Sequence, residues 1–373
     1  MAYSSYMAQA PKKLKIALIF GGKSVEHEVS LQSAKNIIDA LDKIKYEVVL
    51  VGINKDGTWS LKNQNNFLLN STNPKLIALN KNNLKSKEIE NSLVVINQEE
   101  KRGKIDVAFP ILHGPYGEDG TMQGFLKLAG IPFVGPSVLG SSVGFDKDVT
   151  KRLLTEARIL NTDFVSFRNG DKISFSEVKR KLKLPMIIKP ANSGSSVGIS
   201  KVTNENEFKN AVAQAFLFDS KIIIEKFIED KREIECAVLG NNNPKASLCG
   251  EVITDSKHKF YSYEAKYIDE KGARLEIPAN ISKSLQKKIQ DLAVRTFKVL
   301  ELEGMARVDF FVDKKGKIYV NEVNTIPGFT NISMYPALWK ASGLSYTKLI
   351  DELVSLAIER FNKEQKLKTS YND

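Results

Sequence analysis

The first third of the chain alternates apolar runs with amphipathic segments. The apolar runs are short and rich in Ile, Val and Leu, as in buried strands, and the segments between them have helical spacing. Polar caps and glycines mark the helix ends. We expect strands at 15–20, 46–53 and 107–112, a helix at 31–41 capped by Ser30, and a helix at 121–129 stopped by Gly130. This order predicts a doubly wound layer with ligand loops at the carboxyl ends of its strands.

The remainder of the chain predicts a different organisation, because its strand patterns include neighbours of antiparallel type. Three segments have the period of amphipathic helices. We expect strands at 185–190, 199–203, 221–227, 234–239 and 247–253, and helices at 147–154 (capped by Asp146), 282–300 and 346–361. The predicted fold class is therefore α/β, with α+β character in the C-terminal part.

A predicted hairpin at 307–324 carries unusual chemistry. A polar turn ending in Gly316 joins its two strands, and counting back from the turn sets Arg307 opposite Glu322. Because side chains alternate faces along a strand, Arg307, Asp309, Glu322 and Asn324 share one face. A divalent cation with phosphate oxygens suits that face. The alternative is a surface hairpin with a weak cross-strand ion pair.

Candidate phosphate and nucleotide contacts lie upstream of this hairpin. Lys189 ends an apolar strand, where a lysine needs an anionic partner, and the Gly/Ser-rich loop 191–198 that follows can fold its N–H groups over phosphates. A flexible hairpin loop is the plainer alternative. Glu225 ends another strand, where its carboxylate can accept from an exocyclic amine. Lys147 and Lys151 lie near the start of a helix, where solvated lysines are the usual case.

Other loops are candidates on weaker grounds. His113 ends a strand beside glycines, although a lone histidine is more often structural. The polar, Gly/Pro-bearing loop 325–333 follows the hairpin, and the long polar stretch 254–272 contains aromatics, as lids often do. Gly22-Lys23-Ser24 is no P-loop, because Ala17 stands where that motif requires glycine, and G-x-G-x-x-G is absent.

Composition narrows the class of protein. The 373 residues suffice for two or three domains, and the net charge of +11 comes from scattered lysines, with a Lys/Asn-rich surface insertion at 62–104. Aromatic-interleaved basic patches are missing, so we expect no nucleic-acid partner. Cys236 and Cys249 form no C-x-x-C pair, residues 1–12 lack a signal sequence, and no run has the length of a membrane span. We expect a cytoplasmic enzyme or binding protein that uses no membrane.

Several short motifs in a fixed order resemble D-alanine–D-alanine ligases of the ATP-grasp superfamily. The resemblance extends from Lys15 to Lys368. The motifs are Glu-His-Glu-Val-Ser at 26–30, His-Gly with Gly-Glu-Asp-Gly at 113–120, Gly-Ser-Ser-Val-Gly at 194–198, Glu-Ala-Lys-Tyr at 264–267, Arg-Val-Asp at 307–309 and Asn-Glu-Val-Asn-Thr at 321–325, with Pro-Gly-Phe-Thr at 327–330. The resemblance implies a three-domain architecture: a Rossmann-like substrate domain (1–145), a central ATP-grasp subdomain (146–230) and a C-terminal ATP-grasp domain (231–373). It also implies a homodimer.

The resemblance gives each candidate residue a role. It implies two Mg²⁺ (or Mn²⁺) ions at Asp309, Glu322 and Asn324. It implies ATP at Lys147, Lys189, Ser196, Glu225, Lys226, Phe227, Ile228 and Glu233. It implies the first D-alanine beside Glu26, His113, Ser195 and Tyr267, and the second beside Lys266, Ser333 and the backbone of Met334. Arg307 and the Gly328 N–H are the implied oxyanion donors.

The implied reaction has two steps. The carboxylate of the first D-alanine takes the γ-phosphate of ATP, and the amine of the second attacks the acyl phosphate, giving D-alanyl-D-alanine for peptidoglycan. Tyr267 favours D-alanine as the second substrate, because Phe accompanies D-lactate in the family. A D-alanine–D-lactate or D-alanine–D-serine ligase of the same fold is the nearest alternative. An NAD-binding protein is disfavoured by the missing glycine motif.

Overall fold

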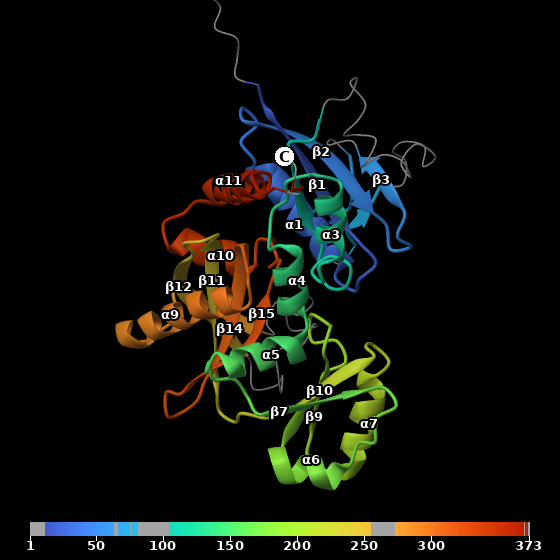
Figure 1. The fold of residues 1–373 in the computed structure, drawn as a ribbon, viewed down its shortest axis with the longest axis vertical. Helices are drawn as coiled ribbons and strands as arrows, with labels where there is room; N and C mark the ends of the chain where they lie inside the picture. The colour runs from blue at the N-terminus through green and yellow to red at the C-terminus, as the bar shows by residue number, and fades with distance from the viewer. Residues whose placement is uncertain are drawn as a thin grey trace, which may run out of the picture.

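The computed structural model describes residues 12–62, 66–74, 76–80, 104–254, 273–368 and 370–371. Figure 1 shows the N-terminal part at the top, the central part at the bottom and the C-terminal part between them. Most of the Lys/Asn-rich insertion and, apart from Thr254, the whole predicted lid lie outside the described residues. Among the helices described, none combines the length and the apolar character that crossing a membrane requires.

The N-terminal sheet confirms the predicted doubly wound layer. Its order is β3 (Trp59–Lys62), β2 (Tyr46–Ile53), β1 (Leu14–Gly21) and β6 (Val107–Ile111), with β1 parallel to β2 and β6 and β3 antiparallel to β2. Ile16 and Leu18 of β1 pack in one core with α1 (His27–Ala40), whereas Ala17 and Ile19 pack in another with α3 (Thr121–Leu128). A separate ribbon of β4 (Leu68–Leu69) and β5 (Ala78–Leu79) lies beside α1.

The start of α1 differs from the prediction. The helix begins at His27, with Glu26 at its N-cap position, so Ser30 is not the cap. The Ser30 hydroxyl is buried instead, where it accepts from the Gly21 N–H at 2.7 Å and donates to the Ile111 carbonyl. Sequence rules favour a serine at a helix start, but here the hydroxyl joins the helix to two strands. The extra turn brings Glu26 to the carboxyl end of β1.

The central sheet is antiparallel throughout. Its order is β7 (Phe164–Arg168), β10 (Lys221–Lys226), β8 (Met186–Pro190) and β9 (Ser200–Val202). Two helices, α6 (Phe175–Leu182) and α7 (Glu205–Ala215), share a core with one face, to which Ile188 and Ile224 contribute. Because strand residues alternate, Lys189 and Glu225 point to the opposite face. The sequence therefore places both charged side chains on the face that the two helices leave uncovered.

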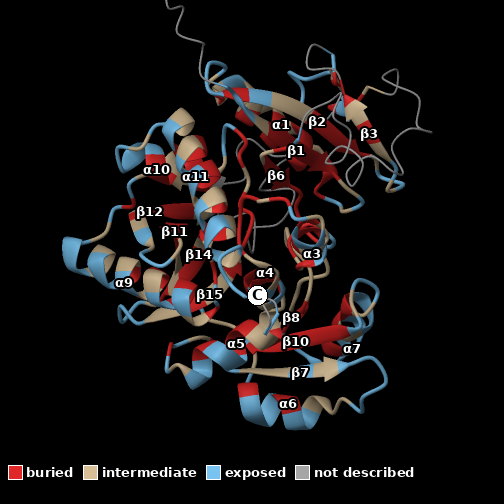
Figure 2. Ribbon diagram, turned by 45° about the horizontal axis from the view of Figure 1, so that its top comes forward, coloured by how far each residue is buried: buried red, intermediate tan, exposed pale blue. Residues whose placement is uncertain are grey.

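The C-terminal sheet is also antiparallel, as predicted for its first two strands. Its order is β13 (Ala273–Glu276), β12 (Lys245–Thr254), β11 (Arg232–Gly240), β14 (Gly304–Val312) and β15 (Ile318–Asn324). Helix α9 (Lys283–Val299), capped by Ser282, packs on one face, and α10 (Met334–Ala341) packs on the other. Figure 2 shows buried residues concentrated in the strands and in the helix faces that cover them.

The N-terminal and C-terminal sheets share one hydrophobic core. Helix α11 (Tyr346–Glu364) contacts α1 and β6 as well as β11 and β14. The buried ring of Phe329 packs edge-on against Phe109 of β6, with 6.0 Å between ring centroids. Arg360 of α11 donates to the carbonyls of Gly135 and Phe133 at 2.6 and 2.8 Å. The predicted domain boundaries stay a prediction, because this core joins the first and third parts.

Candidate active site

A cavity between the central and C-terminal sheets brings together most of the predicted nucleotide residues. Those lining it are Lys189, Ser196, Glu225, Lys226, Phe227, Ile228 and Glu233. Asp309 and Glu322 line the same cavity from the C-terminal sheet. Lys147 does not line it. The cavity therefore has lysines and a carboxylate on one wall and the predicted metal carboxylates on the other.

Glu225 forms a buried ionic cluster at one wall of this cavity. Its Oε1 lies 2.9 Å from the Lys189 ammonium and 3.5 Å from the Lys151 ammonium, and its Oε2 accepts from the Thr162 hydroxyl at 3.0 Å. Burial alone raises the pKa of Glu225, but Lys151 and Lys189 outweigh it and lower the pKa to about 2. Lys151 is not a solvated helix lysine, the usual case: its side chain is 1 % exposed, and burial lowers its pKa to about 8.

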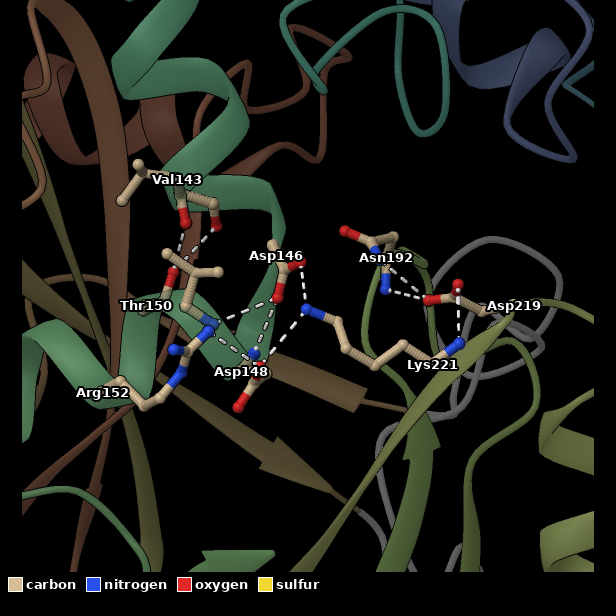
Figure 3. Close-up of polar contacts among 10 residues, drawn as sticks. Val143, Asp146, Asp148, Thr150, Arg152, Asn192, Asp219 and Lys221 are labelled. Atoms are coloured by element: carbon tan, nitrogen blue, oxygen red, sulfur yellow. Dashed lines mark hydrogen bonds and ion pairs between the residues drawn. The ribbon is translucent and has the colours of Figure 1, made fainter. Parts of the chain in front are cut away.

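Helix α5 (Lys147–Glu156) holds Lys147 against the Gly/Ser loop. Asp146 caps it as predicted, accepting from the N–H groups of its first turn, and also pairs with Lys221 of β10, as Figure 3 shows. The Lys147 N–H donates to the Ala191 carbonyl at 3.0 Å, and its ammonium donates to the Ser193 carbonyl at 2.5 Å. Burial lowers the pKa of Lys147. A charged side chain thus lies at the base of the predicted phosphate loop.

The predicted hairpin is present, but its register differs. Asp309 faces Glu322, and Arg307 faces Asn324 rather than Glu322. The turn extends one residue beyond Gly316, because Val312 pairs with Ile318. Asn321 is an extra residue that bulges from β15 between the pairs formed by its neighbours. The longer turn and the bulge each shift the strand pairing by one residue, so together they leave the same side chains on the same face of the hairpin. The prediction of one shared polar face is therefore confirmed, although the pairing behind it was wrong.

Arg307 links the carboxylates of this face. Its guanidinium donates to both oxygens of Asp309, at 2.7 and 2.8 Å, and lies 2.7 Å from the Glu235 carboxylate. Burial by itself lowers the pKa of Arg307, but Asp309, Glu235 and Glu322 keep it well above its ordinary value. The cation is therefore permanently charged beside Glu235 and Asp309, which line the cavity.

The donors on this face fit magnesium that also binds phosphate. Asp309 and Glu322 are directly opposite, and the Asn324 amide nitrogen donates to Asp309 at 2.9 Å, so its amide oxygen is the atom with ligand capacity. Within the described ranges, no group of three or more His, Cys, Asp or Glu side chains could hold a metal ion. Two carboxylates and an amide make an incomplete protein cage, and Mg²⁺ commonly completes such a set with substrate phosphates.

Glu26, Ser195 and His113 meet where the Gly/Ser loop approaches the N-terminal sheet. The Ser195 hydroxyl donates to the Glu26 carboxylate. A Cβ at Gly194 would lie 2.7 Å from Glu26 Oε2, so a larger residue here would displace that carboxylate. Ser195 has a left-handed backbone, with φ of 49°, a strain typical of functional loops. His113 is buried with Nδ1 3.0 Å from the Ile326 carbonyl, and burial lowers its pKa.

The loop after β15 forms a turn around the Ser333 hydroxyl. That oxygen accepts from the Thr330 N–H at 2.9 Å and lies 2.8 Å from the Thr330 hydroxyl. Ser333 precedes α10, whose first residue, Met334, is buried. A Cβ at Gly328 would lie 2.7 Å from the Ser333 oxygen, so the two segments are in close contact. The structure therefore places Gly328, Ser333 and Met334 together, while Lys266 and Tyr267 lie outside the described residues.

Sequence reasoning gave Glu118 no role, although it lies in one of the motifs. Its carboxylate is buried and accepts from the N–H groups of Gly114 and Ile326, at 2.7 and 3.0 Å. Burial and the charge of Glu26 raise the pKa of Glu118 to about 8. The side chain ties the loop after β6 to the loop after β15. Its place between two glycines was the only available signal.

Family models and curated relatives cover almost the whole chain. The D-ala D-ala ligase N-terminus model matches residues 15–136, and the D-ala D-ala ligase C-terminus model matches residues 153–355. A D-alanine–D-alanine ligase from Oceanobacillus iheyensis is 52 % identical over 97 % of this chain and 100 % of the relative. D-alanine–D-alanine ligase A from Escherichia coli is 50 % identical over 96 % of this chain and 100 % of the relative.

Solved structures agree with the sequence relatives. The D-alanine–D-alanine ligase from Coxiella burnetii superposes with a TM-score of 0.78 at 37 % identity, covering 95 % of this chain and 96 % of that one. A D-Ala:D-Ser ligase from Enterococcus faecalis gives 0.79 at 35 % identity, covering 93 % and 100 %. The Bacillus anthracis ligase complexed with ATP gives 0.72 at 27 % identity, covering 94 % and 100 %. These likenesses confirm the predicted ATP-grasp fold class, and the chain belongs to the D-alanine–D-alanine ligase family.

Proposed function

We propose that this chain joins two D-alanines into D-alanyl-D-alanine at the expense of ATP, through a D-alanyl phosphate. The observation that carries the proposal is the meeting of the N-terminus of α1 with three loops. Glu26 touches Ser195 of the Gly/Ser loop, and Glu118 ties the His113 loop to the loop that bears Gly328. An amino-acid site with an anionic group for its ammonium thereby adjoins a nucleotide cavity. The relatives that are 52 % and 50 % identical to this chain are named as D-alanine–D-alanine ligases.

The first step requires positioning and charge neutralisation more than covalent catalysis. Glu26 would hold the ammonium of the first D-alanine, with the Ser195 hydroxyl fixed beside it. Lys147 and Lys189 would neutralise the phosphates, since Lys147 already contacts the base of the loop that would cover them. The carboxylate of the bound D-alanine then attacks the γ-phosphate, and ADP leaves.

The polar face of the hairpin would hold two Mg²⁺ or Mn²⁺ ions. When bound by Asp309, Glu322 and Asn324, such ions supply charge neutralisation for the phosphate oxygens. The facing positions of Asp309 and Glu322 and the oriented amide of Asn324 support this assignment.

The second step develops negative charge on the former carbonyl oxygen of the acyl phosphate. Arg307 and the Gly328 N–H would donate to that oxygen, and loss of one such donor costs about 10²–10³ in rate. The described contacts of Arg307 use Nε and Nη2, and Nη1 would be its donor to that oxygen. Ser333 and the Met334 N–H, at the start of α10, would hold the second carboxylate. The family resemblance adds Lys266 and Tyr267 to the proposed site.

D-Alanine is the proposed second substrate because Tyr267 stands in the lid motif. The likeness to the D-Ala:D-Ser ligase from Enterococcus faecalis makes D-serine the competitor to test. We further propose a cytoplasmic homodimer with domains at 1–145, 146–230 and 231–373, on the family resemblance.

The test is phosphate release from ATP by the purified full chain with Mg²⁺, supplied with D-alanine, L-alanine, or D-alanine paired with D-serine or D-lactate. We expect release that depends on D-alanine, with D-alanyl-D-alanine as the product by mass spectrometry. A rate of phosphate release that is the same with and without D-alanine would refute ligase activity. A main product containing D-serine or D-lactate would refute the assigned second substrate.

A further inference from the structure

Two cations and a hydroxyl surround one buried carboxylate beside the nucleotide cavity. Glu225 is 4 % exposed in its side chain, and its partners are Lys151, Lys189 and Thr162. Only Lys189 of these partners lines the cavity. Lys151 belongs to α5, one helical turn after Lys147, and its buried side chain does not line the cavity. A ligand in the cavity can therefore contact Lys189 but not Lys151.

An anionic ligand competes for Lys189 but not for Lys151. When phosphates bind, the Lys189 ammonium gains oxygen partners outside its 2.9 Å contact with Glu225. A buried carboxylate that loses its cation takes up a proton. Protonation would replace an acceptor with a donor, and the exocyclic amine of adenine needs an acceptor. A second, ligand-inaccessible cation removes this conflict.

The geometry of Lys151 suits that task. Its ammonium donates to the Thr162 hydroxyl at 2.6 Å and to the Thr162 carbonyl at 3.3 Å, and it approaches Asn161 at 3.5 Å. The Thr162 hydroxyl in turn donates to Glu225 Oε2. Hydrogen bonds thus link Lys151 to one carboxylate oxygen through Thr162, while its charge acts on the other directly. This linkage fixes both the charge and the rotation of the carboxylate.

We propose that Lys151 is a positioning residue for nucleobase selection, which holds Glu225 ionised and oriented toward the 6-amino group while Lys189 serves the phosphates. This inference rests on the proposed function, because it takes ATP as the substrate and Glu225 as the acceptor for its amine. It assigns α5 two tasks along one nucleotide, with Lys147 at the phosphates and Lys151 at the base.

The test compares ATP with inosine triphosphate, which has an oxygen in place of the 6-amino group. In Lys151→Met we expect the KM for ATP to rise about tenfold, as for loss of a charge-assisted hydrogen bond, with the kcat at saturating ATP changed less than threefold. The KM for inosine triphosphate should stay within about twofold, so that the preference for ATP falls about tenfold. Thr162→Val should move the preference in the same direction, and Thr162→Ser should restore it.

A matched control separates this role from a purely structural one. Lys221 is also a buried lysine paired with carboxylates, but its partners Asp146 and Asp148 do not line the cavity. Lys221→Met should change the KM values for the two nucleotides by equal factors. An unchanged preference in both Lys151→Met and Thr162→Val would overturn the inference, and if Lys151→Met does not fold, Thr162→Val decides alone. Failure of the wild-type chain to release phosphate with D-alanine would instead overturn the proposed function.

Discussion

Replacement of Arg307 tests whether its charge and its forked donors have separate consequences. The side chain is 14 % exposed and contacts two carboxylates at 2.7 Å. Arg307→Met leaves these carboxylates without their cation, and breaking a buried pair in this way costs about 3–5 kcal/mol. In a chain of 373 residues that loss corresponds to a Tm lower by about 4–6 °C.

Arg307→Lys keeps the charge but loses the fork. A lysine can remain near Asp309, so we expect most of the stability to survive. A single ammonium cannot both hold Asp309 and donate to the oxyanion in the original geometry. We therefore expect the kcat of Arg307→Lys to fall by about 10²–10³.

The two consequences are measured separately. The Tm of thermal unfolding without nucleotide measures the effect of losing the charge of Arg307. The kcat of phosphate release at saturating ATP and D-alanine measures the effect of losing its forked donors. Arg274→Met is the matched control, because Arg274 is an exposed arginine of the same sheet and should change neither quantity. The reasoning fails if Arg307→Lys retains kcat within threefold, or if Arg307→Met unfolds at the wild-type temperature.

Three further predictions concern the surroundings of the site. Glu118→Gln should lower the free energy of unfolding by about 1–3 kcal/mol in denaturant titration. Each oxygen of Glu118 accepts from a backbone N–H, and the new NH₂ group would replace one of these acceptors. Unchanged stability would contradict this. Gly194→Ala should raise the KM for the first D-alanine at least tenfold with little change in Tm, because its Cβ would lie 2.7 Å from the Glu26 carboxylate. The control is Gly124→Ala, whose Cβ would meet nothing within 4 Å and should leave that KM unchanged. Glu225 has a pKa lowered from 4.5 to about 2, so its charge stabilises the fold above pH 4.5, and the stability difference between wild type and Glu225→Gln should shrink as the pH falls toward 2. A difference that is independent of pH would exclude that titration.

Local rules predicted most of the secondary structure. The helices after Asp146 and Ser282 begin where a capping side chain precedes an amphipathic segment, and each cap accepts from the first turn of its helix. The strand at 46–53 and its partners are short apolar runs that need burial on both faces. Alternation along the hairpin also predicted its polar face. These features depend on residues a few positions apart, so the sequence contains the information directly.

The hairpin shows where that information ends. Its register depends on one extra turn residue and on the Asn321 bulge, neither of which changes the hydrophobic pattern of the strands. Ser30 likewise has the chemistry of a helix cap, but β1 and β6 supply better partners for its hydroxyl. In both cases pairing with another element overrode a local preference.

The sequence by itself determined most of the strands and helices, the Asp146 cap and the presence of carboxylates, lysines and glycines suited to ATP chemistry. Tertiary structure alone decided which of them meet. Glu26 reaches Ser195 across 169 positions, and Glu118 reaches Ile326 across 208. Lys151 changes from an ordinary surface lysine into a buried partner of Glu225 only when α5 packs against the central sheet. The reason is physical: burial and charge pairing arise from packing between distant segments, which no local pattern encodes.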